Sequence, residues 1–232
     1  METAFKKLSG TCLIFGSLLM VATMVLHPSG GNIEHILKIK NVLIVSHSLA
    51  IFSLPFIGFG FWGLSTSLLT KSRISFLAFI ISCFGLIAAM MAATINGLTL
   101  PLFLTRAASQ NDAVNLVVTY GHYINKPMDY ILLSAFGLSI SIWSALIIRN
   151  EQFPEWIGYY GLLLVLAGLL AVFNQHNITG LHGFRIIVSG IISWIIVAGI
   201  KKGSHGTMPA FGQVLNESQV GAIAAYIQGL KK

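Results

Sequence analysis

Long runs of apolar residues dominate the first 200 positions of this chain, and short polar stretches separate them. A helix that spans a bilayer needs about 20 mostly apolar residues, within a range of about 17 to 25. Six runs meet this requirement, over residues 9–26, 42–68, 75–98, 128–148, 156–173 and 183–200. The pattern therefore predicts an all-α fold, a six-helix transmembrane bundle.

The stretches between the runs carry residues that end helices. His27 is followed by Pro-Ser-Gly-Gly, and Pro and Gly are the strongest breakers. Pro101 is expected to kink or end the third helix, which otherwise runs on to Leu104. Residues 105–126 form the longest piece that does not span. Part of it, 113–123, is expected to lie flat at the membrane interface.

The composition confirms that lipid is the solvent of this chain. It is 55% hydrophobic and only 9% charged, whereas soluble domains carry about 25% charged residues. The net charge of +7 comes from 14 basic and 7 acidic residues. The basic residues sit in pairs beside apolar runs, as membrane flanks do, and form no extended stripe that would bind nucleic acid. We expect an integral protein of the bacterial cytoplasmic membrane, with the lipid bilayer as its first partner.

Small residues recur inside the predicted spans at spacings typical of helix contacts. Close approach of two backbones stabilises helix pairs in lipid. The positions expected at such contacts are Gly58, Gly60, Ser134, Gly137, Gly161, Gly168, Ser189 and Gly190.

Six of the seven histidines are predicted to gather at one face of the membrane. The first, third and fifth loops share that face, and His47 enters it from about two turns inside the second helix. Asp129 is expected about one residue inside the fourth helix. Because imidazole is the commonest metal ligand and titrates near neutrality, the cluster suggests a metal, a b-type haem or a proton relay. The metal-ligand candidates are His47, His122, His176 and His182. The alternative is that these side chains have no ligand and simply lie in the hydrated headgroup region.

The last 30 residues, 203–232, form a second segment after the membrane domain of residues 1–202. Asn216 is a good N-cap, and Gln219 three positions later completes a capping box. The apolar residues from Val220 to Leu230 follow one helical face, which predicts a short C-terminal amphipathic helix. Such a helix needs a partner for its apolar face.

The tail resembles the end of class I cytochrome c domains. The residues that carry the resemblance are Met208-Pro209-Ala210-Phe211-Gly212, then Leu215, Gln219, Ala222 to Ile227, and Leu230. The resemblance implies that Met208 is an axial ligand of a haem iron, as suits electron transfer. It also implies a location outside the cytoplasm, whereas seven basic residues on the side of the termini against five opposite favour the inside.

The tail departs from that family in one essential feature. Covalent haem attachment uses C-x-x-C-H, and neither Cys12 nor Cys83 belongs to such a motif. The chain alone is therefore not expected to hold a c-type haem. The tail is then a remnant of a fused domain, a segment that docks on the haem protein of a partner such as a cytochrome or respiratory complex, or a surface helix.

Three functions follow from these residues. The first is a membrane protein associated with electron transfer. The second is a small-molecule or ion transporter that uses His47, Asn96 and Asp129 and whose tail is a docking helix. An enzyme with histidine-bound metal is the third, and it is not favoured because no nucleophile–base pair or ligand motif is visible.

Overall fold

A computed structural model describes residues 2–27, 32–69, 72–107, 112–149 and 153–199. Within these ranges the chain is helical and has no strand, which confirms the predicted all-α class. The elements are α1 (Glu2–Leu26), α2 (Ile33–Lys38), α3 (Lys40–Leu68), α4 (Ile74–Ala93), the π-helix η1 (Thr94–Thr99), α5 (Leu100–Arg106), α6 (Asp112–Ile148), α7 (Glu155–Phe173) and α8 (Leu181–Gly199). Six helical segments are long and apolar enough to cross a membrane, as the sequence predicted: Ala4–Leu26, Lys40–Leu68, Ile74–Arg106, Asp112–Ile148, Glu155–Phe173 and His182–Gly199.

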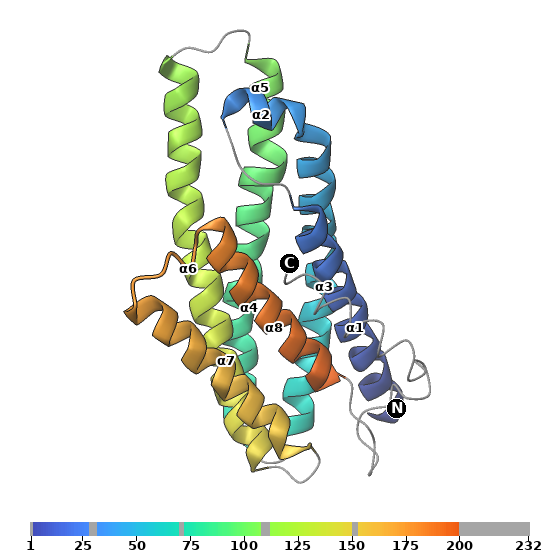
Figure 1. Cartoon of the computed structure of the whole chain (residues 1–232). Coiled ribbons are helices and arrows are strands. Elements are labelled where there is room, and N and C mark those ends of the chain that lie inside the picture. The colour runs from blue at the N-terminus through green and yellow to red at the C-terminus, as the bar shows by residue number, and fades with distance from the viewer. Residues whose placement is uncertain (1, 28–31, 70–71, 108–111, 150–152, 200–232) are drawn as a thin grey trace.

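The six spans form a ring in chain order. α1 packs against α3, α3 against α4, α4 against α6, α6 against α7, and α7 against α8, which returns to α1 (Figure 1). The start of α1 and the end of α8 thus lie at one end of the bundle, which we call the terminal end. The opposite end carries α2, α5 and the first turns of α6, and we call it the capped end.

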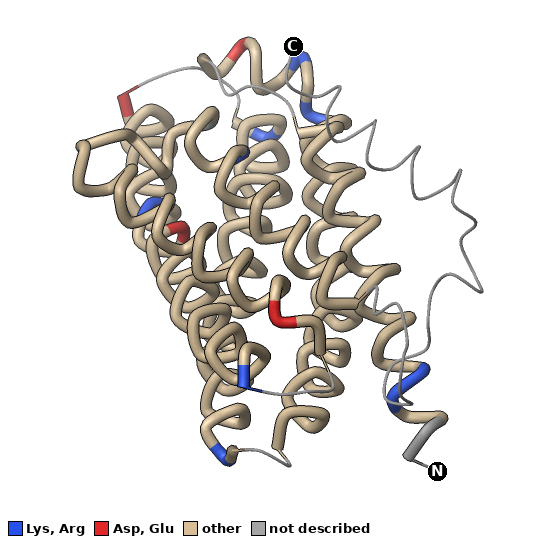
Figure 2. The backbone as a smooth tube through the Cα atoms, turned by 60° about the horizontal axis from the view of Figure 1, so that its bottom comes forward, with Lys and Arg blue, Asp and Glu red and all other residues tan. Residues whose placement is uncertain are grey.

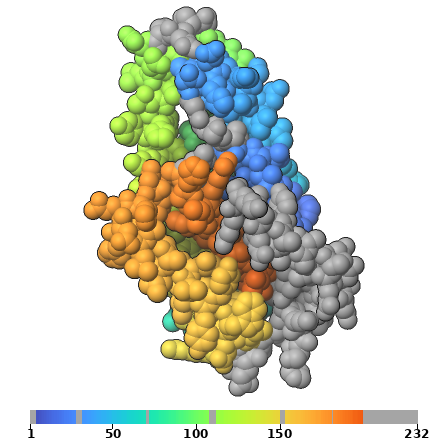
Figure 3. Space-filling view, in the orientation of Figure 1, coloured from blue at the N-terminus to red at the C-terminus, as the bar shows by residue number. Residues whose placement is uncertain are grey.

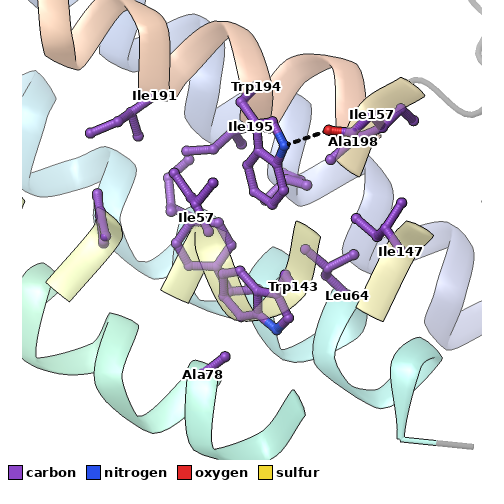
Figure 4. Close-up of a cluster of buried hydrophobic side chains, with 14 of the residues drawn as sticks. Ile57, Leu64, Ala78, Trp143, Ile147, Ile157, Ile191, Trp194, Ile195 and Ala198 are labelled. Atoms are coloured by element: carbon purple, nitrogen blue, oxygen red, sulfur yellow. Dashed lines mark hydrogen bonds between the residues drawn. The ribbon is translucent and has the colours of Figure 1, made fainter. Parts of the chain in front are cut away.

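Aromatic side chains fill the middle of the ring towards the terminal end. The Trp143 and Trp194 rings are stacked, with centroids 6.3 Å apart and an interplanar angle of 9°. Phe61 packs against Trp143 at 5.0 Å and against Phe136 at 5.8 Å. The Trp194 indole N–H donates to the Ile157 carbonyl at 3.1 Å, so α8 is tied to α7 (Figure 4). These contacts give the bundle a closely packed core.

Small residues let neighbouring helices approach, as predicted, but not at every expected position. A Cβ on Gly60 would lie 2.5 Å from Leu13 Cδ1, and one on Gly161 would lie 2.1 Å from Ser144 Oγ. Contact at these two glycines is therefore tight. Gly137 and Gly168 have no atom within 4 Å of such a Cβ, so the expectation is wrong for them. A larger residue at either position would not clash with a neighbouring helix.

The helices differ greatly in length, which shapes the capped end. α7 and α8 have 19 residues each, or about 28 Å at 1.5 Å per residue, close to the hydrocarbon thickness of about 30 Å. α6 has 37 residues, or about 55 Å, and its first turns extend beyond the turn between α7 and α8 (Figure 1). A small separate cluster of Ile36, Leu104 and Val114 holds α2, α5 and α6 together there.

Two expectations about the third and fourth spans are settled by these helices. The third helix runs through Pro101 to Arg106, in line with the predicted extension. The prediction that residues 113–123 lie flat as a separate segment is wrong, because α6 is one helix that continues through Pro127. Asp129 is consequently the eighteenth residue of α6 rather than its second. The polar stretch 112–127 is helical, and Val114 within it is buried in the small cluster.

Charged residues are sparse along the helices (Figure 2). This arrangement fits a chain whose long apolar surfaces face lipid, and several of these surfaces are exposed in the isolated structure, such as Phe84 on α4 and Leu163 on α7. The predicted tail, with Met208 and the amphipathic helix over 216–230, lies outside the described residues.

Candidate functional site

His47 is a buried histidine of α3, between Ser46 and Ser48. Its side chain is 7% exposed. The Nδ1 atom lies 2.8 Å from the Leu43 carbonyl oxygen and 3.2 Å from Ser46 Oγ. Since a carbonyl only accepts hydrogen bonds, Nδ1 carries the proton and donates it. In the neutral ring, Nε2 is then the nitrogen that accepts a proton or ligates a metal, which is how backbone carbonyls orient ligand histidines.

His27 packs directly on His47. The two ring centroids are 4.9 Å apart, with an interplanar angle of 51°. The His27 carbonyl oxygen, at the end of α1, accepts a hydrogen bond from Nη2 of Arg185 in α8. A guanidinium at the last carbonyls of a helix satisfies acceptors that have no partner inside the helix. This bond closes the ring of helices at the level of the histidine pair.

The π-helix η1 makes room for His47. Its wide turn is seen in the hydrogen bond from the Leu100 N–H to the Ile95 carbonyl, five residues earlier. Gly97, in this turn, lies against the imidazole: a Cβ there would stand 2.0 Å from His47 Cγ and 2.1 Å from His47 Cβ. Only glycine fits this position without displacing the histidine. Single π-turns inside α-helices occur frequently at functional sites.

Asn125 adds a polar group from α6 at nearly the same level. Phe61 of α3 contacts Phe136 of α6, 75 residues later, and Leu43 and Val118, also 75 residues apart, pack against the same small cluster. The same offset places His47 level with residue 122, less than one turn from Asn125. Asn125 is 8% exposed, and its Nδ2 donates to Asp129 Oδ2 at 3.1 Å. Its Oδ1 is buried and has no hydrogen-bond partner among the described residues.

These groups form a polar layer across the bundle near the capped end. We use the name histidine layer for His27, His47, Asn125, Asp129 and Arg185. They come from four of the six spans, α1 with its final residue, α3, α6 and α8. The layer includes two of the buried polar residues, His47 and Asn125.

The structure separates the four metal-ligand candidates named from the sequence. His47 is buried, while His122, His176 and His182 are exposed. Among the residues that the structure describes, no three His, Cys, Asp or Glu side chains come close enough to hold a metal ion. Metal binding by this quartet stays a prediction.

Sequence reasoning found His47 and Asp129 but missed three features of the layer. It did not assign Gly97 a role, did not pair His27 with His47, and did not connect Arg185 to α1. A single glycine in an apolar run carries no signal for a π-turn. The pairing of His27 and His47 follows from the antiparallel packing of α1 and α3, which the sequence does not specify.

No family model, curated protein or solved structure matches this chain.

Proposed function

We propose that this integral membrane protein is a component of an electron-transfer system, in which His47 offers a ligand for a haem iron inside the bundle and Met208 offers one outside it. The observation that carries the proposal is the setting of His47. Its Nδ1 is held by the Leu43 carbonyl, so in the neutral ring Nε2 carries the lone pair of a buried side chain. Such a nitrogen could ligate a haem iron, and a haem would supply one-electron transfer there.

The His27 ring does not serve as the opposite ligand in this arrangement. It is in contact with the His47 ring, with centroids 4.9 Å apart, so nothing as thick as a porphyrin fits between the two. Gly97 lies against Cβ and Cγ of His47, which helps to fix the imidazole in place.

The resemblance of the tail to cytochrome c suggests a different site for Met208. α8 ends at Gly199, at the terminal end, and Met208 follows nine positions later. Nine positions are too few for a further span, which needs about 17 residues or more. Met208 is therefore proposed to act at the terminal end, away from the histidine layer, on the haem of a partner such as a cytochrome.

An absorption spectrum of the purified full chain, oxidised and then reduced with dithionite, tests the proposal. We expect a Soret band that is lost in His47→Ala and in the more conservative His47→Gln. The band should be retained in His122→Ala, a matched control because His122 is an exposed histidine of the same end. In the complex with a co-purified cytochrome, Met208→Ala should alter the spectrum of the partner.

The absence of a haem band from both the protein and its co-purified complex would contradict electron transfer. Equal loss of the band in His47→Gln and His122→Ala would contradict the assignment to His47. A chain without haem whose substrate movement survives removal of residues 203–232 would favour the transport function instead.

A further inference from the structure

The first turns of α6 rise beyond the membrane. α7 has about the length of the hydrocarbon region, and it packs closely on α6 where Gly161 meets Ser144 and Gly158 meets Ile148. Since the two helices are antiparallel and rise equally per residue, the end of α7 is level with about residue 130 of α6. Residues of α6 up to 120 are therefore about 15 Å or more beyond the hydrocarbon, whereas the headgroups add only about 5–8 Å on each side.

A row of apolar side chains on these turns is left uncovered. Leu116, Tyr120 and Tyr123 are 69%, 67% and 69% exposed. They lie on the face of α6 opposite Val114 and Asn125, which are buried. Figure 1 and Figure 3 show the first turns of α6 at the edge of the bundle. Lipid tails do not reach Leu116 and Tyr120, so the row indicates a contact with protein.

The row continues down α6 with a regular spacing. Steps of four and three residues alternate through the exposed positions Leu116, Tyr120, Tyr123, Pro127, Tyr130 and Ser134. The same steps lead on to Gly137 and Ser141, within the hydrocarbon. A repeat of 3.5 residues is the spacing of the contact between two helices that coil around each other. We call this line of positions, from Leu116 to Ser141, the α6 seam.

Small residues leave room for a second helix where the seam lies in lipid. A Cβ on Gly137 would meet no atom within 4 Å, so the space beside Gly137 is open. The Ser141 hydroxyl donates to the Gly137 carbonyl at 2.8 Å and is thus satisfied within α6. Close approach of two backbones at such positions stabilises helix pairs in lipid. The seam therefore has large side chains in its first turns and small ones within the hydrocarbon.

The partner that fits this seam is a helix that also continues from lipid into water. α6 itself, with 37 residues, is such a helix. Copies of one chain have the same orientation in a membrane, so two α6 helices meet in parallel about a two-fold axis normal to the membrane. Each position of one seam then faces the same position of the other, as in any contact about a two-fold axis.

The seam offers about the area that a specific contact needs. Tyr120, Tyr123 and Tyr130 are 67%, 69% and 46% exposed. An aromatic side chain presents about 200 Å², so these three expose about 360 Å² in one copy and about 700 Å² in two. Specific interfaces bury about 1,000 Å² or more in total. Leu116 and the smaller residues of the seam supply the rest.

We propose that α6 pairs with α6 of a second copy along this seam, which makes the protein a parallel homodimer. Leu116, Tyr120 and Tyr123 form the part of the contact that lies outside the hydrocarbon. Gly137 and Ser141 form the part within it. The dimer does not depend on any haem at His47.

Disulfide cross-linking of single cysteines in membranes that contain the full chain tests this proposal. Cys12→Ser and Cys83→Ser provide the background, and Leu116→Cys or Ser134→Cys is added to it. Because identical positions face each other, each of these two variants should form a covalent dimer on oxidation. Val117→Cys is the matched control. Val117 is 47% exposed at the same height, but it points about 100° away from Leu116 and should cross-link several-fold less.

The mass of the purified full chain in a mild detergent measures the same contact without cross-linking. The unchanged chain should have about twice the single-chain mass of 25.1 kDa. Leu116→Ser combined with Tyr120→Ser should weaken dimerisation about ten-fold or more, because large side chains at the centre of a contact carry most of its binding energy. Both residues are exposed in the single chain, so the variant should still fold. Val117→Ser should remain dimeric.

Three results would overturn the proposal. They are a monomeric unchanged chain, equal cross-linking at positions 116 and 117, and a dimer that persists undiminished in the double variant.

Discussion

Gly97→Ala is expected to drive the His47 side chain from its place. The new Cβ would stand 2.0 Å from His47 Cγ, and because that atom is close to the backbone, a small rotation of the ring cannot relieve the contact. Either the imidazole leaves the layer or η1 moves away from α3. Overpacking of this kind costs about 1–3 kcal/mol, occasionally more. The expected result is a less stable protein in which His47 is accessible.

Modification of histidines by diethylpyrocarbonate, located by mass spectrometry, measures this accessibility. His47 should react slowly in the unchanged chain, because it is 7% exposed, and several-fold faster in Gly97→Ala. Gly121→Ala is the matched control, since a Cβ on Gly121 meets nothing within 4 Å. Alanine there should leave His47 protected and stabilise the helix by up to about 1 kcal/mol. Slow modification of His47 in both variants would show that η1 does not hold it.

The second large effect is expected from Trp143→Ala. Trp143 is 0% exposed and contacts both Phe61 and Trp194, so its removal leaves a cavity where α3, α6 and α8 meet. Truncation of a buried aromatic residue costs about 3–5 kcal/mol in soluble proteins. We expect a value near the lower end, about 3 kcal/mol, because unfolded helices in a membrane still have lipid around their apolar side chains.

Thermal unfolding in detergent, followed by circular dichroism, measures this loss. Trp156→Ala is its control, because Trp156 is 57% exposed on α7 and its loss removes few packing contacts within the protein. We expect the unfolding midpoint to fall clearly in Trp143→Ala and to change little in Trp156→Ala. Equal shifts of the midpoint in the two variants would show that the aromatic core contributes no more to stability than the exposed surface of α7 does.

The apolar runs of the sequence were enough to predict the spans, because burial in lipid requires long apolar helices whatever their neighbours. Local polarity misled the prediction at residues 113–123, which belonged to the predicted non-spanning stretch of residues 105–126. α6 continues through Pro127, which lacks a backbone N–H, and Val114 at its start is buried in the small cluster. Whether a helix continues through such a polar stretch depends on tertiary packing, which local sequence does not reveal.

The candidate site was predicted only in part for a similar reason. The concentration of histidines at one end followed from the alternation of loops, and His47 was recognised because a polar group inside a span is costly. The π-turn at Gly97 is different, since it depends on the fit between η1 and a side chain some 50 positions earlier. The bond from Arg185 to the His27 carbonyl depends likewise on the closure of the ring by α8.

Labelling of single cysteines with a membrane-impermeant maleimide tests the central claim, a six-span bundle whose histidine layer lies towards the capped end. Cys12→Ser and Cys83→Ser provide the background, and single cysteines replace the exposed residues His122, His176, Arg73 and Arg149. In intact and inverted vesicles, we expect His122→Cys and His176→Cys to react from one side and Arg73→Cys and Arg149→Cys from the other. Reaction of position 122 from the same side as position 149 would contradict the account.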